Sequence, residues 1–120
     1  MESALQSNAL ESLWEIAGGS AEVFCELIDD FTSMAVETIA TLEKALANGD
    51  AKAAEHAAHS LKGSSAMMGA ALVRHASEAI EKAAARGDLT QAREGLVKLR
   101  EADLVTRQEL SLARKQPPPG

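Results

Sequence analysis

Three neighbouring residues, a histidine, a lysine and a glycine at positions 59, 62 and 63, have side chains suited to handling a phosphoryl group. An exposed imidazole is largely neutral near pH 7 and carries a free lone pair on one ring nitrogen. That nitrogen can attack phosphorus and form a covalent phosphoramidate. The attached group brings roughly two negative charges, which a lysine one helical turn away partly offsets. The stretch therefore indicates phosphoryl transfer through His59, assisted by Lys62.

These residues belong to a segment, residues 51–68, that has the pattern of an amphipathic helix. At about 100° per residue, one face collects small and apolar side chains and must meet the core: Ala54, Ala57, Ala58, Leu61, Ser65 and Met68. His59 lies about 140° from Ala54 on the same wheel. We therefore expect its ring to be exposed, which argues against a hydrogen-bonded histidine of the core.

The exposed side of the same helix carries further residues that spacing places around the histidine. We expect Glu55 to orient the imidazole by accepting a hydrogen bond from its second nitrogen. A partner-binding surface is predicted from these neighbours and the next turns: Lys52, Glu55, His56, Ala66 and Met67.

Gly63 is unusual because a glycine inside a helix costs about 1 kcal/mol relative to alanine. One interpretation is that it leaves room beside the histidine for an approaching partner. The other is that it is a tolerated defect, or that a neighbouring helix approaches it closely. Spacing alone does not choose between them.

Helix-breaking residues divide the chain at 18–20, 48–50 and 86–88. In the last two, a glycine suits the left-handed end of one helix and an aspartate suits the N-cap of the next. Helices are predicted at 8–17, 20–47, 51–68, 70–86 and 89–114. Long amphipathic segments joined by tight turns are typical of an all-α, antiparallel four-helix bundle, here with a short extra N-terminal helix. The bundle is expected over residues 1–114, followed by a disordered proline-rich tail at 115–120.

Apolar stripes predict the buried faces of two further helices, and Trp14 is expected to plug one end of the core. The stripe of the second helix comprises Val23, Leu27, Phe31, Met34, Thr38, Leu42 and Ala45. That of the fourth comprises Leu72, Val73, Ala76, Ile80 and Ala83.

Composition supports a helical fold and excludes several classes of function. The 120 residues are 46% hydrophobic but only 2% aromatic, which disfavours a β-sheet protein. A net charge of −6 argues against binding to nucleic acid or to anionic lipid. No stretch approaches the roughly 20 apolar residues that cross a membrane, and no signal peptide is visible. We expect a cytoplasmic protein, in which the single cysteine, Cys25, is a small buried or half-buried hydrophobic side chain.

Other chemistries fit the sequence less well. His56 and His59 form a possible metal pair, but they lie about 60° apart on the wheel and lack a suitably spaced carboxylate, so no metal site is predicted. Ser64 and Ser65 lack an Asp-His relay, and Ser65 is expected to bond back to the carbonyl four residues before it. No glycine-rich loop of the ATP-binding kind is present.

Residues 59–70, with the sequence HSLKGSSAMMGA, resemble the signature of histidine phosphotransfer (HPt) domains, roughly H-x-L-K-G-[SA]-[SA]-x-x-[LI]-G-A. The resemblance extends over about residues 8–112. Two positions depart from the family pattern: Met68 stands where many members have leucine or isoleucine, and His75 stands where many have cysteine. Neither position is the reacting residue.

The resemblance implies a phosphorelay intermediate. His59 would accept a phosphoryl group, through the nitrogen farther from Cβ, from a receiver-domain aspartate and pass it to another receiver. Lys62 would neutralise the group, and Gly63 would leave clearance. Partners would be the receiver domains of response regulators and hybrid histidine kinases. The protein would act as a monomer, without ATP-dependent kinase activity or a cofactor of its own, since Mg²⁺ would come with the receiver. The alternative is a non-catalytic helical module that binds a partner through Gly63, Ala66 and Met67.

Overall fold

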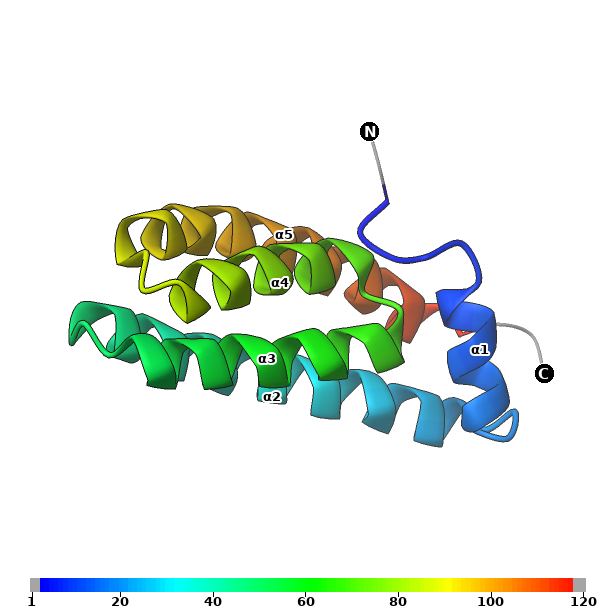
Figure 1. Cartoon of the computed structure of the whole chain (residues 1–120). Helices are drawn as coiled ribbons and strands as arrows, with labels where there is room; N and C mark the ends of the chain where they lie inside the picture. The colour runs from blue at the N-terminus through cyan, green and yellow to red at the C-terminus, as the bar shows by residue number, and fades with distance from the viewer. Residues whose placement is uncertain (1–2, 118–120) are drawn as a thin grey trace.

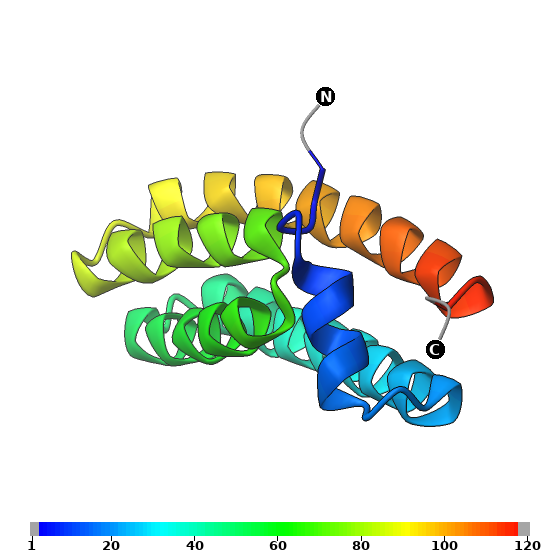
Figure 2. The same cartoon turned by 90° about the vertical axis from the view of Figure 1, so that its right-hand side faces the viewer.

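The computed structural model describes residues 3–117 and contains five helices with no strand in that range. They are α1 (Ala9–Ile16), α2 (Ala21–Ala47), α3 (Ala51–Met68), α4 (Ala71–Ala85) and α5 (Leu89–Lys115). Helices α2 to α5 form an elongated antiparallel bundle, and α1 lies across one end of it (Figures 1 and 2). The predicted all-α bundle is confirmed, and each predicted helix boundary lies within one residue of the observed one.

The C-terminal boundary of the bundle differs slightly from the prediction. Lys115, expected to begin the tail, is the last residue of α5. Residues 118–120, which make up much of the predicted disordered tail, lie outside the described residues. Within residues 3–117, none of the helices has the length and apolar character needed to cross a membrane.

The turn between α2 and α3 and the turn between α4 and α5 both have the glycine and the capping aspartate in the predicted roles. Gly49 and Gly87 have φ values of 71° and 74°, in the left-handed region that glycine adopts without a steric penalty. The Asp50 carboxylate accepts a hydrogen bond from the backbone N–H of Ala53 at 3.0 Å. Asp88 caps α5 in the same way. These caps set where α3 and α5 begin and therefore the register of their side chains.

The core lies between the four long helices, and the stripe predicted for α2 is displaced from the buried one. Its buried residues are Phe24, Ile28, Phe31, Ala35, Ile39, Leu42, Ala45 and Leu46. Val23 is exposed, while Leu27, Met34 and Thr38 are only half-buried. The reason is that α2 packs against both α3 and α5, which buries a different and broader face than the stripe suggested.

The buried face of α4 also differs from the predicted stripe, because it includes a serine. Val73, Ile80 and Ala83 are buried as predicted, but Leu72 and Ala76 are half-buried. The buried face of α4 also includes a polar residue, Ser77, and a small one, Ala84. The Ser77 hydroxyl donates to the carbonyl of Val73 at 2.7 Å, which satisfies a hydroxyl that would otherwise be costly to bury.

The core face of α3 is close to the predicted one. Ala54, Ala57, Ala58, Leu61 and Ser65 are buried, and Met68 is half-buried. The prediction that the Ser65 hydroxyl bonds back to the carbonyl four residues earlier is wrong, because this buried hydroxyl has no hydrogen-bond partner among residues 3–117. Alanines dominate this face, so α3 packs closely on its neighbours and its position in the bundle is well defined.

Trp14, predicted to plug one end of the core, and Cys25, predicted to be buried or half-buried, both pack at one end of the bundle. Trp14 of α1 is half-buried and meets Phe24 edge to face, with ring centroids 5.4 Å apart. Cys25 is half-buried, and its Sγ lies 3.6 Å from the carbonyl oxygen of Arg114. Both contacts join elements at the end of the bundle that α1 covers.

The segment before α1 is tied to the turn between α3 and α4. The backbone N–H of Gln6 donates to the Gly69 carbonyl at 2.8 Å, and that of Leu72 donates to the Ala4 carbonyl at 3.2 Å. On the other side, the Glu109 carboxylate of α5 accepts from the Ala4 N–H at 2.7 Å. The segment therefore joins the C-terminal end of α3 to α5.

Substitution of Gly69, the residue that follows α3, tests how much this turn contributes to the stability of the protein. Its φ is +74°, and an added Cβ would lie 2.7 Å from Ala9 Cβ of α1. We expect Gly69→Ala to lower the free energy of unfolding by about 3 kcal/mol, because a left-handed alanine and a steric clash add up. Gly49→Ala is the matched control, since φ is +71° there but the space is open, and about 1 kcal/mol is expected. Equal losses in urea unfolding would contradict the role of the contact with α1.

Candidate functional site

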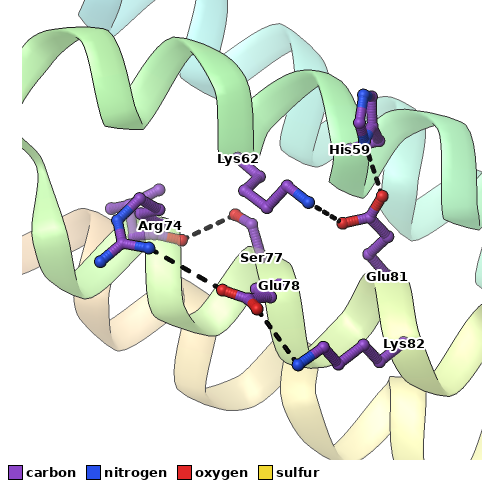
Figure 3. Close-up of polar contacts among 8 residues, drawn as sticks. His59, Lys62, Arg74, Ser77, Glu78, Glu81 and Lys82 are labelled. Carbon is purple, nitrogen blue, oxygen red and sulfur yellow. Dashed lines mark hydrogen bonds and ion pairs between the residues drawn. The ribbon is translucent and has the colours of Figure 1, made fainter.

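His59 lies on the exposed face of α3, as predicted from the helical wheel. Its side chain is 68% exposed, and Nδ1 lies 2.6 Å from Oε2 of Glu81 on α4 (Figure 3). Among the described residues, no hydrogen bond is found to the other ring nitrogen, Nε2. The ring is therefore held by one nitrogen and presents the second to solvent.

Glu81 also contacts Lys62, one turn after the histidine on α3. The Lys62 Nζ lies 2.6 Å from Oε1 of Glu81, so the two carboxylate oxygens serve two different partners (Figure 3). The hydrogen bond from Lys62 lowers the pKa of Glu81 below its usual value, and His59 lowers it further, whereas burial opposes both effects. The carboxyl group is therefore ionised at neutral pH.

The ionised carboxylate determines where the proton of the imidazole lies. A carboxylate only accepts hydrogen bonds, so Nδ1 of the neutral ring must be the donor to Glu81. The lone pair is then on Nε2, the nitrogen farther from Cβ, which is the exposed one. The site thus combines a nucleophilic nitrogen, a fixed ring and a neighbouring ammonium group.

Glu81 replaces Glu55 as the residue that orients the ring, which corrects the expectation from the sequence. Glu55 is half-buried on α3, and no hydrogen bond joins it to His59 among the described residues. Glu81 is 22 residues away in sequence and reaches the histidine only because α3 and α4 pack side by side. The one feature of the sequence that points to Glu81 as a partner of α3 is its position next to Ile80, at the edge of the apolar face of α4.

Gly63 faces open space. An added Cβ would have no atom within 4 Å, and the residue is exposed. The interpretation that a neighbouring helix approaches it closely is therefore wrong. What remains is that the glycine is a tolerated defect or that it leaves clearance for a partner beside His59.

The predicted partner-binding surface is largely accessible. Lys52, His56, Ala66 and Met67 are exposed, and Glu55 is half-buried. Met67 is 86% exposed and borders an apolar hollow that α1, α2 and α3 line together. Among residues 3–117, none of these residues forms a hydrogen bond or ion pair with His59 or with Glu81. No group of three or more His, Cys, Asp or Glu side chains in that range could hold a metal ion.

A second set of charges follows the same face of α4. Glu78 lies between Lys82, at 3.1 Å, and Arg74, at 3.8 Å (Figure 3). The hydrogen bond from Lys82 is the main cause that lowers the pKa of Glu78. Glu78 and Glu81 are thus two ionised carboxylates on one helix, of which only Glu81 contacts the histidine.

Comparison with known proteins agrees with this geometry. The sequence matches the Hpt domain family over residues 26–114. The structure is similar to the crystal structure of histidine-containing phosphotransfer protein B (HptB) from Pseudomonas aeruginosa PAO1, with a TM-score of 0.88 and 31% sequence identity. That similarity covers 94% of this chain and 96% of the other. No curated protein matches the sequence.

Proposed function

Because this chain belongs to the Hpt domain family and acts in histidine phosphotransfer in phosphorelay signalling, we propose that His59 is the residue that carries the phosphoryl group. The observation that supports this most strongly is its exposed Nε2, on a ring held through Nδ1 by Glu81. The other two histidines, His56 and His75, are exposed but have no carboxylate partner among the described residues. The alternative of a helical module without phosphotransfer is set aside, because the family match indicates phosphotransfer.

The proposed reaction begins with an acyl phosphate on the aspartate of a receiver domain. The Nε2 lone pair attacks phosphorus, the bond from phosphorus to the aspartate oxygen breaks, and the carboxylate leaves with the electron pair. The ring then carries a positive charge, with the proton still on Nδ1 facing Glu81. In the onward step, the aspartate of a second receiver attacks phosphorus. The bond from phosphorus to Nε2 breaks, and Nε2 takes back the electron pair.

Lys62 and Gly63 are proposed to assist this step by charge and by clearance. Phosphoryl transfer depends mainly on positioning and on electrostatic stabilisation of the moving group. The ammonium group of Lys62 lies one turn from the histidine and is 31% exposed, so it can approach a phosphoryl oxygen while it remains near Glu81. The open space at Gly63 admits the loops of a receiver close to the ring.

Receiver domains of response regulators and hybrid histidine kinases are the proposed partners. The surface around His59 that would meet them includes Lys52, Glu55, His56, Ala66 and Met67. We propose that the protein works as a cytoplasmic monomer without a cofactor of its own, and that Mg²⁺ enters the complex with the receiver. Transfer by positioning and charge needs nothing further from the histidine side.

The test is direct transfer from a radiolabelled, phosphorylated receiver to the purified protein. We expect label that is lost in acid and kept in alkali, as a phosphohistidine requires, and that maps to the peptide containing His59. A panel of receivers is used so that the result does not depend on one partner. Absence of label from every receiver, or label on another peptide, would contradict the proposal.

Replacement of Lys62 by alanine tests the proposed charge compensation. We expect transfer to slow roughly tenfold, which corresponds to about 1.4 kcal/mol of lost transition-state stabilisation. The free energy of unfolding should change by less than about 1 kcal/mol, because the ion pair with Glu81 is partly exposed. Lys98→Ala, which removes an exposed lysine from α5, is the matched control. Equal transfer rates in the two variants, measured by rapid quenching, would show that Lys62 has no such role.

A further inference from the structure

We infer that Met67 is a site of oxidative modification, at which conversion of its thioether to a sulfoxide weakens the binding of a receiver domain. The inference rests on the proposed function, because it concerns the regulation of the surface around His59. It assigns a role to a side chain that takes no part in the transfer of the phosphoryl group itself.

The first argument is the exposure of the sulfur atom. Met67 is 86% exposed, more than any other large apolar side chain among the described residues. Met34 and Met68 are half-buried, and the sulfur of Met34 lies 3.4 Å from the hydroxyl of Thr38. An oxidant dissolved in water therefore reaches the sulfur of Met67 more easily than that of the other two.

The second argument is the kind of surface that surrounds this sulfur. Met34, Met67 and Met68 line one hollow, where α1, α2 and α3 meet. The rest of its wall is mostly apolar and includes Leu13, Ile16, Leu27 and Phe31. Exposed apolar side chains that gather around a hollow are typical of a surface that binds another protein. An oxygen atom added to Met67 would therefore lie on an apolar contact surface.

The third argument is the distance from the proposed phosphoryl acceptor. Met67 follows His59 by eight residues on α3, which is about 12 Å along the helix axis and about 80° around it. A stable protein interface covers about 800 Å² on each partner, the area of a circle of roughly 16 Å radius. Gly63 and Ala66 lie between the two on the exposed side of α3 and are too small to hold a partner away. A receiver centred on His59 therefore covers Met67.

The modification is the transfer of one oxygen atom from a peroxide. A lone pair of the sulfur attacks one oxygen of hydrogen peroxide, and the O–O bond breaks with its electrons on the other oxygen. The proton of the transferred oxygen moves to the departing hydroxide, so that water leaves. Sulfur is oxidised by two electrons, and the peroxide is reduced by two.

The product changes the surface in a way that can be reversed. A sulfoxide is polar and chiral, whereas the thioether is apolar and flexible. Binding of a receiver would remove the sulfoxide oxygen from water, which is unfavourable unless a new hydrogen bond replaces the lost ones. Methionine sulfoxide reductases return the side chain to the thioether. Oxidation of Met67 therefore lowers the affinity for a receiver until the sulfoxide is reduced.

The test uses a receiver that exchanges a phosphoryl group with the untreated protein. The protein is treated with hydrogen peroxide, the oxidant is removed, and the Kd for this receiver is measured by calorimetry. We expect tandem mass spectrometry to find the added oxygen on Met67 first, and the Kd to rise about tenfold, which corresponds to about 1.4 kcal/mol. Reductases for both sulfoxide epimers should restore the Kd. Dithiothreitol should not restore it, which separates the effect from reversible oxidation of Cys25.

Met67→Leu and Met68→Leu are the matched pair of variants. Each is compared with itself before and after treatment, so that any effect of the substitution on binding cancels. We expect the Kd of Met67→Leu to be unchanged by peroxide and that of Met68→Leu to rise about tenfold, as in the wild type. The unfolding midpoint of the oxidised wild type should equal that of the untreated protein, because Met67 is exposed. A fall in the midpoint would assign the effect to the half-buried methionines and contradict the inference.

Rapid-quench kinetics separate weaker binding from damage to the reacting histidine. In the oxidised protein, the receiver concentration that gives half the maximal transfer rate should rise about tenfold, and the maximal rate should stay the same. The inference is overturned if the protein with its sulfoxide mapped to Met67 binds as tightly as before, or if Met67→Leu loses affinity as the wild type does. Failure of the proposed function is a different result, in which the untreated protein takes no label on His59 from any receiver.

Discussion

The His59→Gln variant is expected to fold normally and to lose phosphoryl transfer to the detection limit of the assay. Glutamine has an amide group in place of the imidazole, and its nitrogen lone pair is delocalised and not nucleophilic. The position is exposed on α3, and glutamine is a better helix former than histidine, so stability should change by less than about 0.5 kcal/mol. The measurement is transfer of label from a phosphorylated receiver, together with urea unfolding.

His75→Gln is the matched control for this variant. His75 is an exposed histidine of α4 whose Nε2 lies 3.4 Å from the guanidinium of Arg74, and it lies outside the proposed site. We expect His75→Gln to accept label at the wild-type rate. If His59→Gln still accepts label while His75→Gln does not, the assignment of the phosphoryl acceptor is wrong.

Gly63→Leu is expected to make the protein more stable and at the same time to weaken its binding to a receiver. A leucine in place of a helical glycine should stabilise α3 by about 0.8 kcal/mol, since nothing lies within 4 Å of the added Cβ. The same side chain would fill the space beside the His59 ring. We expect the Kd for a receiver to rise at least tenfold, which corresponds to about 1.4 kcal/mol, with a matching fall in transfer.

Gly63→Ala provides the graded comparison, because it stabilises the helix by a similar amount but adds a single methyl group. Its Kd should lie between those of the wild type and Gly63→Leu. Calorimetry with a receiver domain measures binding, and thermal unfolding measures stability. Wild-type affinity in Gly63→Leu would leave the glycine as a tolerated defect of the helix.

The helices and their ends could be predicted from the sequence because their signals are local. Gly49 with Asp50, and Gly87 with Asp88, supply a left-handed helix end and an N-cap within two residues. The exposure of His59 was likewise predictable, because the alanines of α3 define its buried face almost completely. Local rules suffice where one residue's conformation depends on its near neighbours in sequence.

The errors arose where packing between helices decides the outcome. The stripe predicted for α2 does not include Phe24 and Ile28, because the helix packs against α1, α3 and α5 rather than against one neighbour. Glu81 was missed as the partner of His59 because the axial register of α3 against α4 is not encoded in the spacing within either helix. That register depends on the turn at Gly69 and on how small side chains interdigitate.

The segment before α1 has a practical consequence for binding assays. Its backbone hydrogen bonds to Gly69 and Leu72 close one end of the bundle, the end where α5 also finishes (Figure 1). A fluorophore or surface tether attached there would disturb the turn that closes α3. The opposite end, at Asn48 and Arg86, consists of capped exposed turns. A reporter group is therefore better placed at these turns, where it leaves the closing segment intact.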